Sequence, residues 1–182
     1  MKNREDSRKT SIQKLTAIFQ RGDFNLAITA AKKVIEDYQS ADAANILALA
    51  HKRLGEIDKS IEIYESLLIN NPSNTMLLAN LGNIYADQGR LTAAQNLYER
   101  VLNADPNHIN AYLGLGNIYV MQGKSDSALR LYEKMQKEVK DIPQSQLQKI
   151  NYRLAEIYRK GGVKHLDAAI KHYGLSDERL SL

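Results

Sequence analysis

The chain has 182 residues, of which 43% are hydrophobic and 25% are charged, and it contains neither Cys nor Trp. This length is sufficient for a core of ordinary size, and the lack of Cys excludes disulfide bonds, cysteine nucleophiles and thiolate metal sites. The formal net charge of +4 comes from basic ends around a more acidic middle. This distribution is typical of a solvated surface, so we do not expect nucleic-acid binding.

The first predicted element is a helical hairpin near residues 8–40, in which apolar residues recur at helical spacing. Its glycine, Gly22, stands one position closer to Gly55 than Gly55 stands to the next glycine of this kind, Gly89. Gln39 occupies the place where later copies carry Pro. A single deleted residue explains both differences, so this hairpin is interpreted as a weak first copy of a repeat.

From residue 41 onward, equivalent residues recur at a fixed period and define three copies of equal length, 41–74, 75–108 and 109–142. The matched columns contain glycine, tyrosine, leucine and proline: Gly55, Gly89 and Gly123; Tyr64, Tyr98 and Tyr132; Leu47, Leu81 and Leu115; Pro72 and Pro106. Self-similarity at such a period indicates a repeat protein whose units stack on one another.

Each copy is predicted to form two helices. In the middle copy, apolar residues at helical spacing run over 75–88 and stop before Gly89, which suits a left-handed residue at a helix end. A second run covers 91–102 and ends before Pro106. Each helix has one apolar stripe, so neighbouring pairs must stack to bury it.

The last predicted copy is irregular and spans about 144–175, followed by a short capping tail to residue 182. Its two framework tyrosines, Tyr158 and Tyr173, lie two positions further apart than the equivalent pair, Tyr85 and Tyr98. We therefore place an insertion of that size at 161–164. Because this tail has no obvious polar cap, the alternative expectation is a truncated chain.

These elements predict one all-α domain over residues 1–182, a right-handed α-solenoid of stacked helix-turn-helix hairpins. Residues 75–108 resemble the tetratricopeptide repeat (TPR) family and match its pattern at Leu78, Leu81, Gly82, Tyr85, Ala94, Tyr98, Val101 and Pro106. The resemblance extends over about 8–175. It implies a protein-interaction scaffold whose concave groove is lined by the first helix of each copy and binds a partner peptide or helix.

The resemblance also implies candidate peptide-binding residues at the groove-facing places of the first helices. Four of them are amides, which can both donate to and accept from an extended peptide backbone: Asn45, Asn80, Asn83 and Asn117. Relatives attached to sugar transferases use an asparagine ladder in this way. The alternative is that these side chains hold neighbouring helices together, and the sequence leaves both interpretations open.

The other candidates for the groove are Lys149 and Arg153, two basic residues on the first helix of the last copy. With Asn83 they match three of the five places of the carboxylate clamp by which some family members hold acidic C-terminal tails. Ala79 and Gly114 stand at the other two places, so the match is partial. The pattern favours a protein or peptide partner, with an acidic or C-terminal segment as one hypothesis and a solvated basic helix face as the other.

Catalytic and cofactor motifs are not found in the sequence. There is no Ser-His-Asp arrangement or phosphate-binding glycine loop, and His165 and His172 lack a third ligand at metal-binding spacing. We therefore predict a non-catalytic scaffold or adaptor with no cofactor and no metal.

The compartment and assembly are also expectations from the sequence. No apolar run is long enough to enter a membrane and the first residues are charged, which predicts a cytoplasmic protein. We expect a monomer or a weak homo-oligomer. Two alternatives remain open: an accessory domain that recruits the protein substrate of a larger sulfotransferase, glycosyltransferase or oxygenase, and a homo-oligomeric assembly scaffold.

Overall fold

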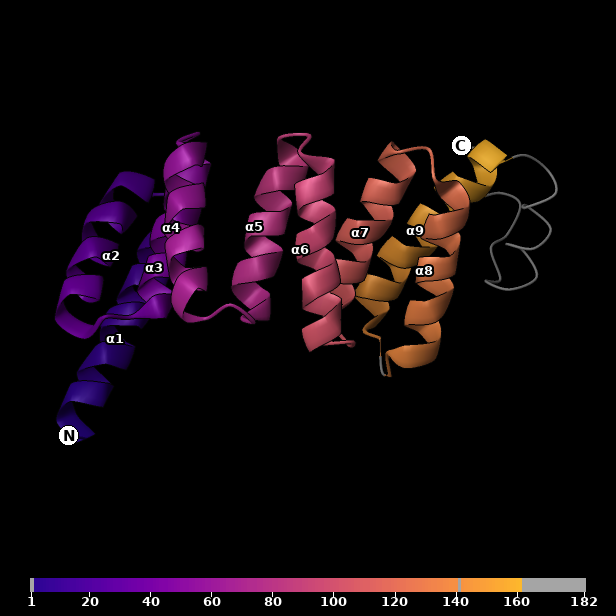
Figure 1. Cartoon of the computed structure of the whole chain (residues 1–182). Helices are drawn as coiled ribbons and strands as arrows, with labels where there is room; N and C mark the ends of the chain where they lie inside the picture. Colours follow the sequence, from indigo (N-terminus) through magenta and orange to yellow (C-terminus); the bar gives the residue numbers. More distant parts are fainter. Residues whose placement is uncertain (1, 141, 162–182) are drawn as a thin grey trace. The chain divides into compact units, whose positions relative to one another are not determined.

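The computed structural model describes residues 2–140 and 142–161, and within them the secondary structure is entirely helical (Figure 1). The helices are α1 (Lys2–Gln20), α2 (Phe24–Tyr38), α3 (Ala41–Arg53), α4 (Ile57–Asn70), α5 (Thr75–Asp87), α6 (Leu91–Ala104), α7 (Ile109–Met121), α8 (Ser125–Glu138) and α9 (Gln144–Gly161). The predicted all-α repeat is therefore confirmed. None of these helices is long and apolar enough to cross a membrane.

The chain divides into two compact units, Met1–Ile84 and Tyr85–Leu182, and the boundary falls inside α5. In the first unit, α2 packs against α1 and α3, α3 packs against α4, and α1 also contacts α3. One buried cluster of this unit is rich in alanine, which lets its helices approach closely: Leu15, Ala27, Ala31, Val34, Ala43, Leu47 and Ala50.

A buried cluster of the second unit consists mainly of larger side chains. Here α7 packs against α6, α8 and α9, and α8 also packs against α9. Aromatic and long aliphatic residues fill the space between the helices: Tyr112, Ala128, Tyr132, Met135, Val139, Ile150, Leu154 and Ile157. These two clusters therefore differ in the size of their residues, although both are built from helical hairpins.

The turn inside each hairpin depends on one glycine. Gly22, Gly55, Gly89 and Gly123 follow the first helices and have φ angles of +87°, +79°, +71° and +73°. Residues with a side chain rarely adopt this left-handed conformation, so the glycine spacing read from the sequence reports a backbone requirement. Gly22 has the same conformation as the others, although it stands one position out of phase.

The start of the first helices has a second periodic feature, which the sequence analysis missed. Ser40, Asn74 and His108 recur at the period of the repeat, and each accepts a hydrogen bond from the backbone N–H three positions later, at 3.3, 3.1 and 3.1 Å respectively. Such a cap satisfies an N–H group that the helix itself leaves unpaired. The column escaped notice because three different residue types perform the same task.

Two features of the weaker copies have local causes. Gln39, which stands in place of Pro, adopts a left-handed φ of 50° and its N–H donates to the carbonyl of Ile35, so a residue other than Pro ends α2. Helix α9 has 18 residues and reaches Gly161, whereas α5 and α7 have 13. The predicted insertion at 161–164 and the partner helix to residue 175 lie almost wholly outside the described residues, so the repeat boundaries there stay a prediction.

Candidate functional site

Three of the predicted binding residues lie in the first unit, and two of them belong to one hydrogen-bonded cluster. The Oδ1 atom of Asn45 on α3 accepts from the hydroxyl of Tyr64 on α4 at 2.9 Å and from Nδ2 of Asn80 on α5 at 3.0 Å. Both asparagines are half-buried, whereas Tyr64 is fully buried. The amide cluster of Asn45, Tyr64 and Asn80 therefore connects three helices.

The side-chain amide of Asn45 has a defined orientation, because its oxygen already accepts hydrogen bonds within the cluster. Both bonds go to its oxygen, while its nitrogen lies 4.0 Å from the sulfur of Met76, a residue that is 42% exposed. Asn83 lies one turn beyond Asn80 on α5 and is exposed. The first unit thus presents an amide nitrogen, an exposed thioether and a further amide near one another along α3 and α5.

Burial keeps the hydroxyl of this cluster protonated. The pKa of Tyr64 is raised well above its usual 10, chiefly because burial penalises the phenolate, and a hydrogen bond with Asn80 offsets this in part. A protonated hydroxyl is a donor at every physiological pH, so the bond to Asn45 is not interrupted by titration.

The other three predicted residues belong to the second unit. Asn117 on α7 is half-buried, and Lys149 on α9 is exposed. Arg153 on α9 donates from Nη1 to Oε2 of Glu156 at 2.8 Å, and its guanidinium lies 5.9 Å from the centre of the Tyr152 ring, which is 63% exposed. The charge of Arg153 is therefore partly offset by a neighbour, whereas Lys149 has no ion pair with the described residues.

Two tyrosines of the second unit, Tyr98 and Tyr132, stand at the repeat position of Tyr64, and the surroundings of Tyr132 differ from those of Tyr64. The Tyr132 hydroxyl is buried and has no hydrogen-bond partner among the described residues. Burial raises its pKa to about 12, with Arg153 lowering and Glu156 raising that value. A Cβ atom on Gly116 would lie 2.2 Å from this hydroxyl oxygen, so glycine leaves room for the ring.

A third polar cluster lies at the turn between α3 and α4. His51, which stands in a tyrosine column of the repeat, is buried and its Nδ1 contacts Oε2 of Glu56, whose Oε1 accepts from Nζ of Lys59 at 2.9 Å. These bonds hold the pKa of Glu56 below its usual 4.5, with Lys59 as the larger cause. Among the described residues no group of His, Asp and Glu could hold a metal ion, and His165 and His172 lie outside them.

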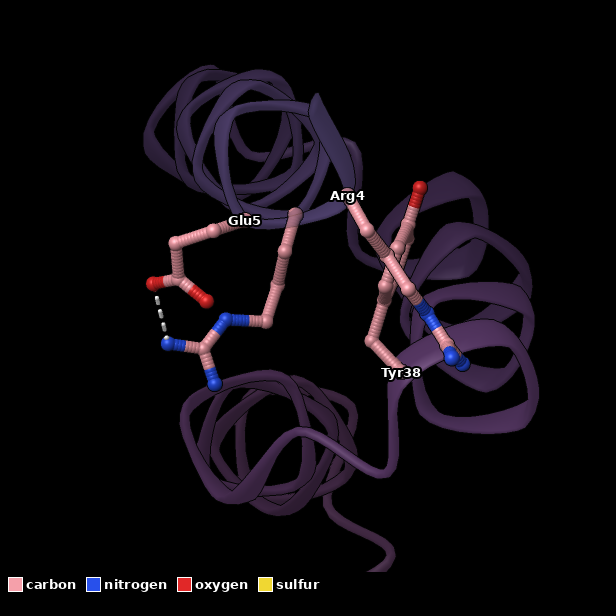
Figure 2. A pocket seen from close by; sticks show the side chains of 4 residues that line it. Arg4, Glu5 and Tyr38 are labelled. Atoms are coloured by element: carbon pink, nitrogen blue, oxygen red, sulfur yellow. Dashed lines mark hydrogen bonds and ion pairs between the residues drawn. The ribbon is translucent and has the colours of Figure 1, made fainter. Parts of the chain in front are cut away.

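A cavity of about 300 Å³ lies where α1 begins and α2 ends, and the sequence analysis did not anticipate it (Figure 2). It is lined by Arg4, Glu5, Arg8 and Tyr38. Arg8 is paired with Glu5 at 2.8 Å, and Arg4 donates to the carbonyl of Asp37 at 3.2 Å. In Figure 2 the Glu5 side chain lies on one side of the cavity, and Arg4 and Tyr38 lie on the other. Arg4 thus joins the start of α1 to the end of α2, whereas the ion pair of Arg8 lies within α1.

The helical hairpins, the glycine turns and the polar surface of the first helices define a helical repeat protein. Two sequence profiles of the tetratricopeptide repeat family match the chain, at residues 16–75 and 73–135, which together cover about two thirds of it. The chain belongs to the tetratricopeptide repeat family, a class of protein-interaction scaffolds that are generally not catalytic. No curated protein matches its sequence.

Solved structures with the same fold include PilF from Pseudomonas aeruginosa, with a TM-score of 0.78 and 22% identity over 94% of this chain and 76% of that one. A TPR protein from Parabacteroides merdae has a TM-score of 0.72 and 18% identity over 96% of this chain and 70% of its own. MamA has a TM-score of 0.64 and 25% identity, covering 72% of this chain and 77% of its own. At these identities the similarity concerns the fold.

Proposed function

We propose that this protein binds an extended segment or helix of a partner protein on the surface of its first helices. The amide cluster of Asn45, Tyr64 and Asn80, beside the exposed Met76, is the observation that supports the proposal most directly. An amide nitrogen next to an exposed thioether suits a peptide that offers a backbone oxygen and an apolar side chain together. The proposed binding residues are Asn45, Asn80, Asn83, Asn117, Lys149 and Arg153.

A preference for acidic or C-terminal segments is the finer part of this proposal. The exposed Lys149 supports it, because an exposed ammonium attracts a carboxylate over the range of a Debye length. The pairing of Arg153 with Glu156 reduces the positive charge available beside it. We therefore expect the basic residues to contribute a salt-dependent increment and the amides to contribute most of the affinity.

The test is to select peptides from a random library displayed on phage with the full chain as bait, and to measure their affinity by isothermal titration calorimetry. Replacing both Asn45 and Asn80 with Ala is expected to weaken binding about tenfold or more, and Asn83→Ala about threefold. The matched control replaces Asn96 and Asn103, exposed asparagines on α6, with Ala, and binding should be unchanged. If the Asn45/Asn80 double variant and Asn83→Ala bind peptide as tightly as the control, the proposed site is contradicted.

The charge component is tested separately with peptides that differ only in one terminal acidic residue. The double variant Lys149→Ala, Arg153→Ala should remove the advantage of the acidic peptide, and salt at about 0.5 M should remove it from the unsubstituted protein as well. An acidic advantage that survives in the double variant would show that these two residues are not its source.

A further inference from the structure

We propose that the Tyr64 hydroxyl is a positioning group of the binding surface: it holds the Asn45 amide with its nitrogen outward, so that the partner segment must present a backbone carbonyl oxygen there. This inference rests on the function proposed above. It adds a residue outside the groove to the determinants of binding, because Tyr64 is fully buried on α4 and cannot touch a partner.

The hydrogen-bond inventory of the amide cluster carries the inference. An asparagine side chain accepts through its oxygen and donates through its nitrogen. Two donors, the Tyr64 hydroxyl and Nδ2 of Asn80, already meet the oxygen of Asn45 at 2.9 and 3.0 Å. Turning the Asn45 amide over would bring its nitrogen against the nitrogen of Asn80, unless Asn80 turned as well. It would also give up the bond that the Tyr64 hydroxyl donates, and this hydroxyl would have to rotate and accept instead.

The outward end of Asn45 is therefore a donor with weak engagement. Its nitrogen faces the Met76 sulfur at 4.0 Å, and a thioether is a weak acceptor. A carbonyl oxygen is a much better acceptor, so an approaching peptide backbone gains a stronger bond than the one this nitrogen makes to the thioether. A partner group that can only donate finds no acceptor on the outward side of this amide.

The second unit offers a natural control for the role of the hydroxyl. Tyr132 occupies the same repeat position as Tyr64, and its buried hydroxyl has no hydrogen-bond partner among the described residues. Removing it should leave every surface amide as it was. Tyr64→Phe and Tyr132→Phe therefore delete the same atom from the same repeat position, but only Tyr64→Phe removes a hydrogen bond to an amide.

The experiment measures the affinity of a selected library peptide for four variants of the full chain. Tyr64→Phe is expected to weaken binding about fivefold, and Tyr132→Phe should not change it. Asn45→Asp keeps the acceptor for Tyr64 and Asn80 but replaces the outward donor with an oxygen, and should weaken binding about 20-fold. In the double variant Tyr64→Phe, Asn45→Asp, the Tyr64 substitution should have no additional effect, because it acts through the amide.

The amide orientation is also measurable in the free protein. Nuclear Overhauser effects should join the Asn45 side-chain amide protons to the Met76 methyl group, weaken in Tyr64→Phe, and persist in Tyr132→Phe. Contacts of these protons with the Tyr64 ring in their place, or no change in Tyr64→Phe, would overturn the positioning role.

The two proposals fail in different ways. If Ala at positions 45 and 80 leaves peptide binding unchanged, the proposed site is wrong whatever the orientation measurements show. If those substitutions weaken binding while Tyr64→Phe and Asn45→Asp bind like the unsubstituted protein, the site stands and the positioning role is wrong.

Discussion

The two units place a buried tyrosine at the same point of the repeat and surround it differently. Tyr64 donates to Asn45 and joins three helices through polar atoms, whereas Tyr132 lies against Gly116 with its hydroxyl unpartnered among the described residues. The repeat position thus specifies a buried tyrosine ring. The residues at neighbouring repeat positions decide whether its hydroxyl finds a hydrogen-bond partner. Resemblance to a repeat pattern alone does not predict this.

The turns inside the hairpins also combine a shared backbone geometry with different side-chain pairs. After α3 and after α5 a backbone N–H donates to a carbonyl five positions earlier, from Glu56 to His51 at 3.0 Å and from Arg90 to Tyr85 at 2.8 Å. The side chains pair by their chemistry: the imidazole contacts the carboxylate, and the guanidinium lies 4.1 Å from the centre of the tyrosine ring. One turn geometry therefore accommodates two different side-chain pairs.

The largest expected effect concerns the glycine beside Tyr132. The first unit has the fully buried Ala48 and also Gly82 at the place of Gly116, but a Cβ on Gly116 would lie 2.4 Å from the Cζ atom of Tyr132. Gly116→Ala should lower the free energy of unfolding by about 3 kcal/mol, measured by urea denaturation followed by circular dichroism. Adding Tyr132→Phe removes the nearest clashing atom and should restore part of the loss. A variant as stable as the unsubstituted protein would show that the two units tolerate the same residue here.

An intermediate effect is expected at the caps of the first helices. His108 caps α7 where the first unit uses Ser40 and Asn74. His108→Ala should cost about 1 kcal/mol of unfolding free energy, whereas His108→Asn should cost nothing, because asparagine is a strong capping residue. The control is Asn107→Ala, which changes the exposed neighbouring residue. Equal losses for Ala and Asn at position 108 would mean that the imidazole contributes something other than its cap.

The smallest effect is a pH dependence confined to the first unit. Because Lys59 and then His51 hold the pKa of Glu56 below its usual 4.5 in the folded state, the unfolded chain takes up that proton first as the pH falls. This contribution is fully present above the usual pKa of 4.5 and disappears as the pH falls through the folded value. Glu56→Gln should therefore lower the melting temperature slightly at about pH 7 and by less as the pH falls below 4.5, and an equal shift over this whole range would contradict the ion-pair origin.

Local sequence rules accounted for most of the helices because their signals are local. The expected helices over 75–88 and 91–102 correspond to α5 and α6, and the glycines of the periodic column end the first helices. The cap column of Ser40, Asn74 and His108 was missed because its members share a hydrogen-bond acceptor and no other chemical feature.

The candidate binding residues were harder to interpret from sequence. Asn45 and Asn80 were open to two interpretations, peptide binding or helix-to-helix bonding, and the structure gives their facing atoms the second role while Asn45 keeps its nitrogen toward Met76. The ion pair between Arg153 and Glu156 follows from an i,i+3 spacing that the sequence contains but that has many alternatives on a charged helix.

The sequence by itself determined the repeat period, the helices and the turns, since periodicity, glycine and proline act over short stretches of chain. Only the tertiary structure decided which polar atoms of those helices remain available. Residues 45, 64 and 80 are brought together by the packing of α3, α4 and α5, and the direction of an amide depends on partners from all three helices. A hydrogen bond between the side chains of Asn45 and Asn80, which are far apart in the sequence, has no local signal, because its energy exists only after the helices have packed.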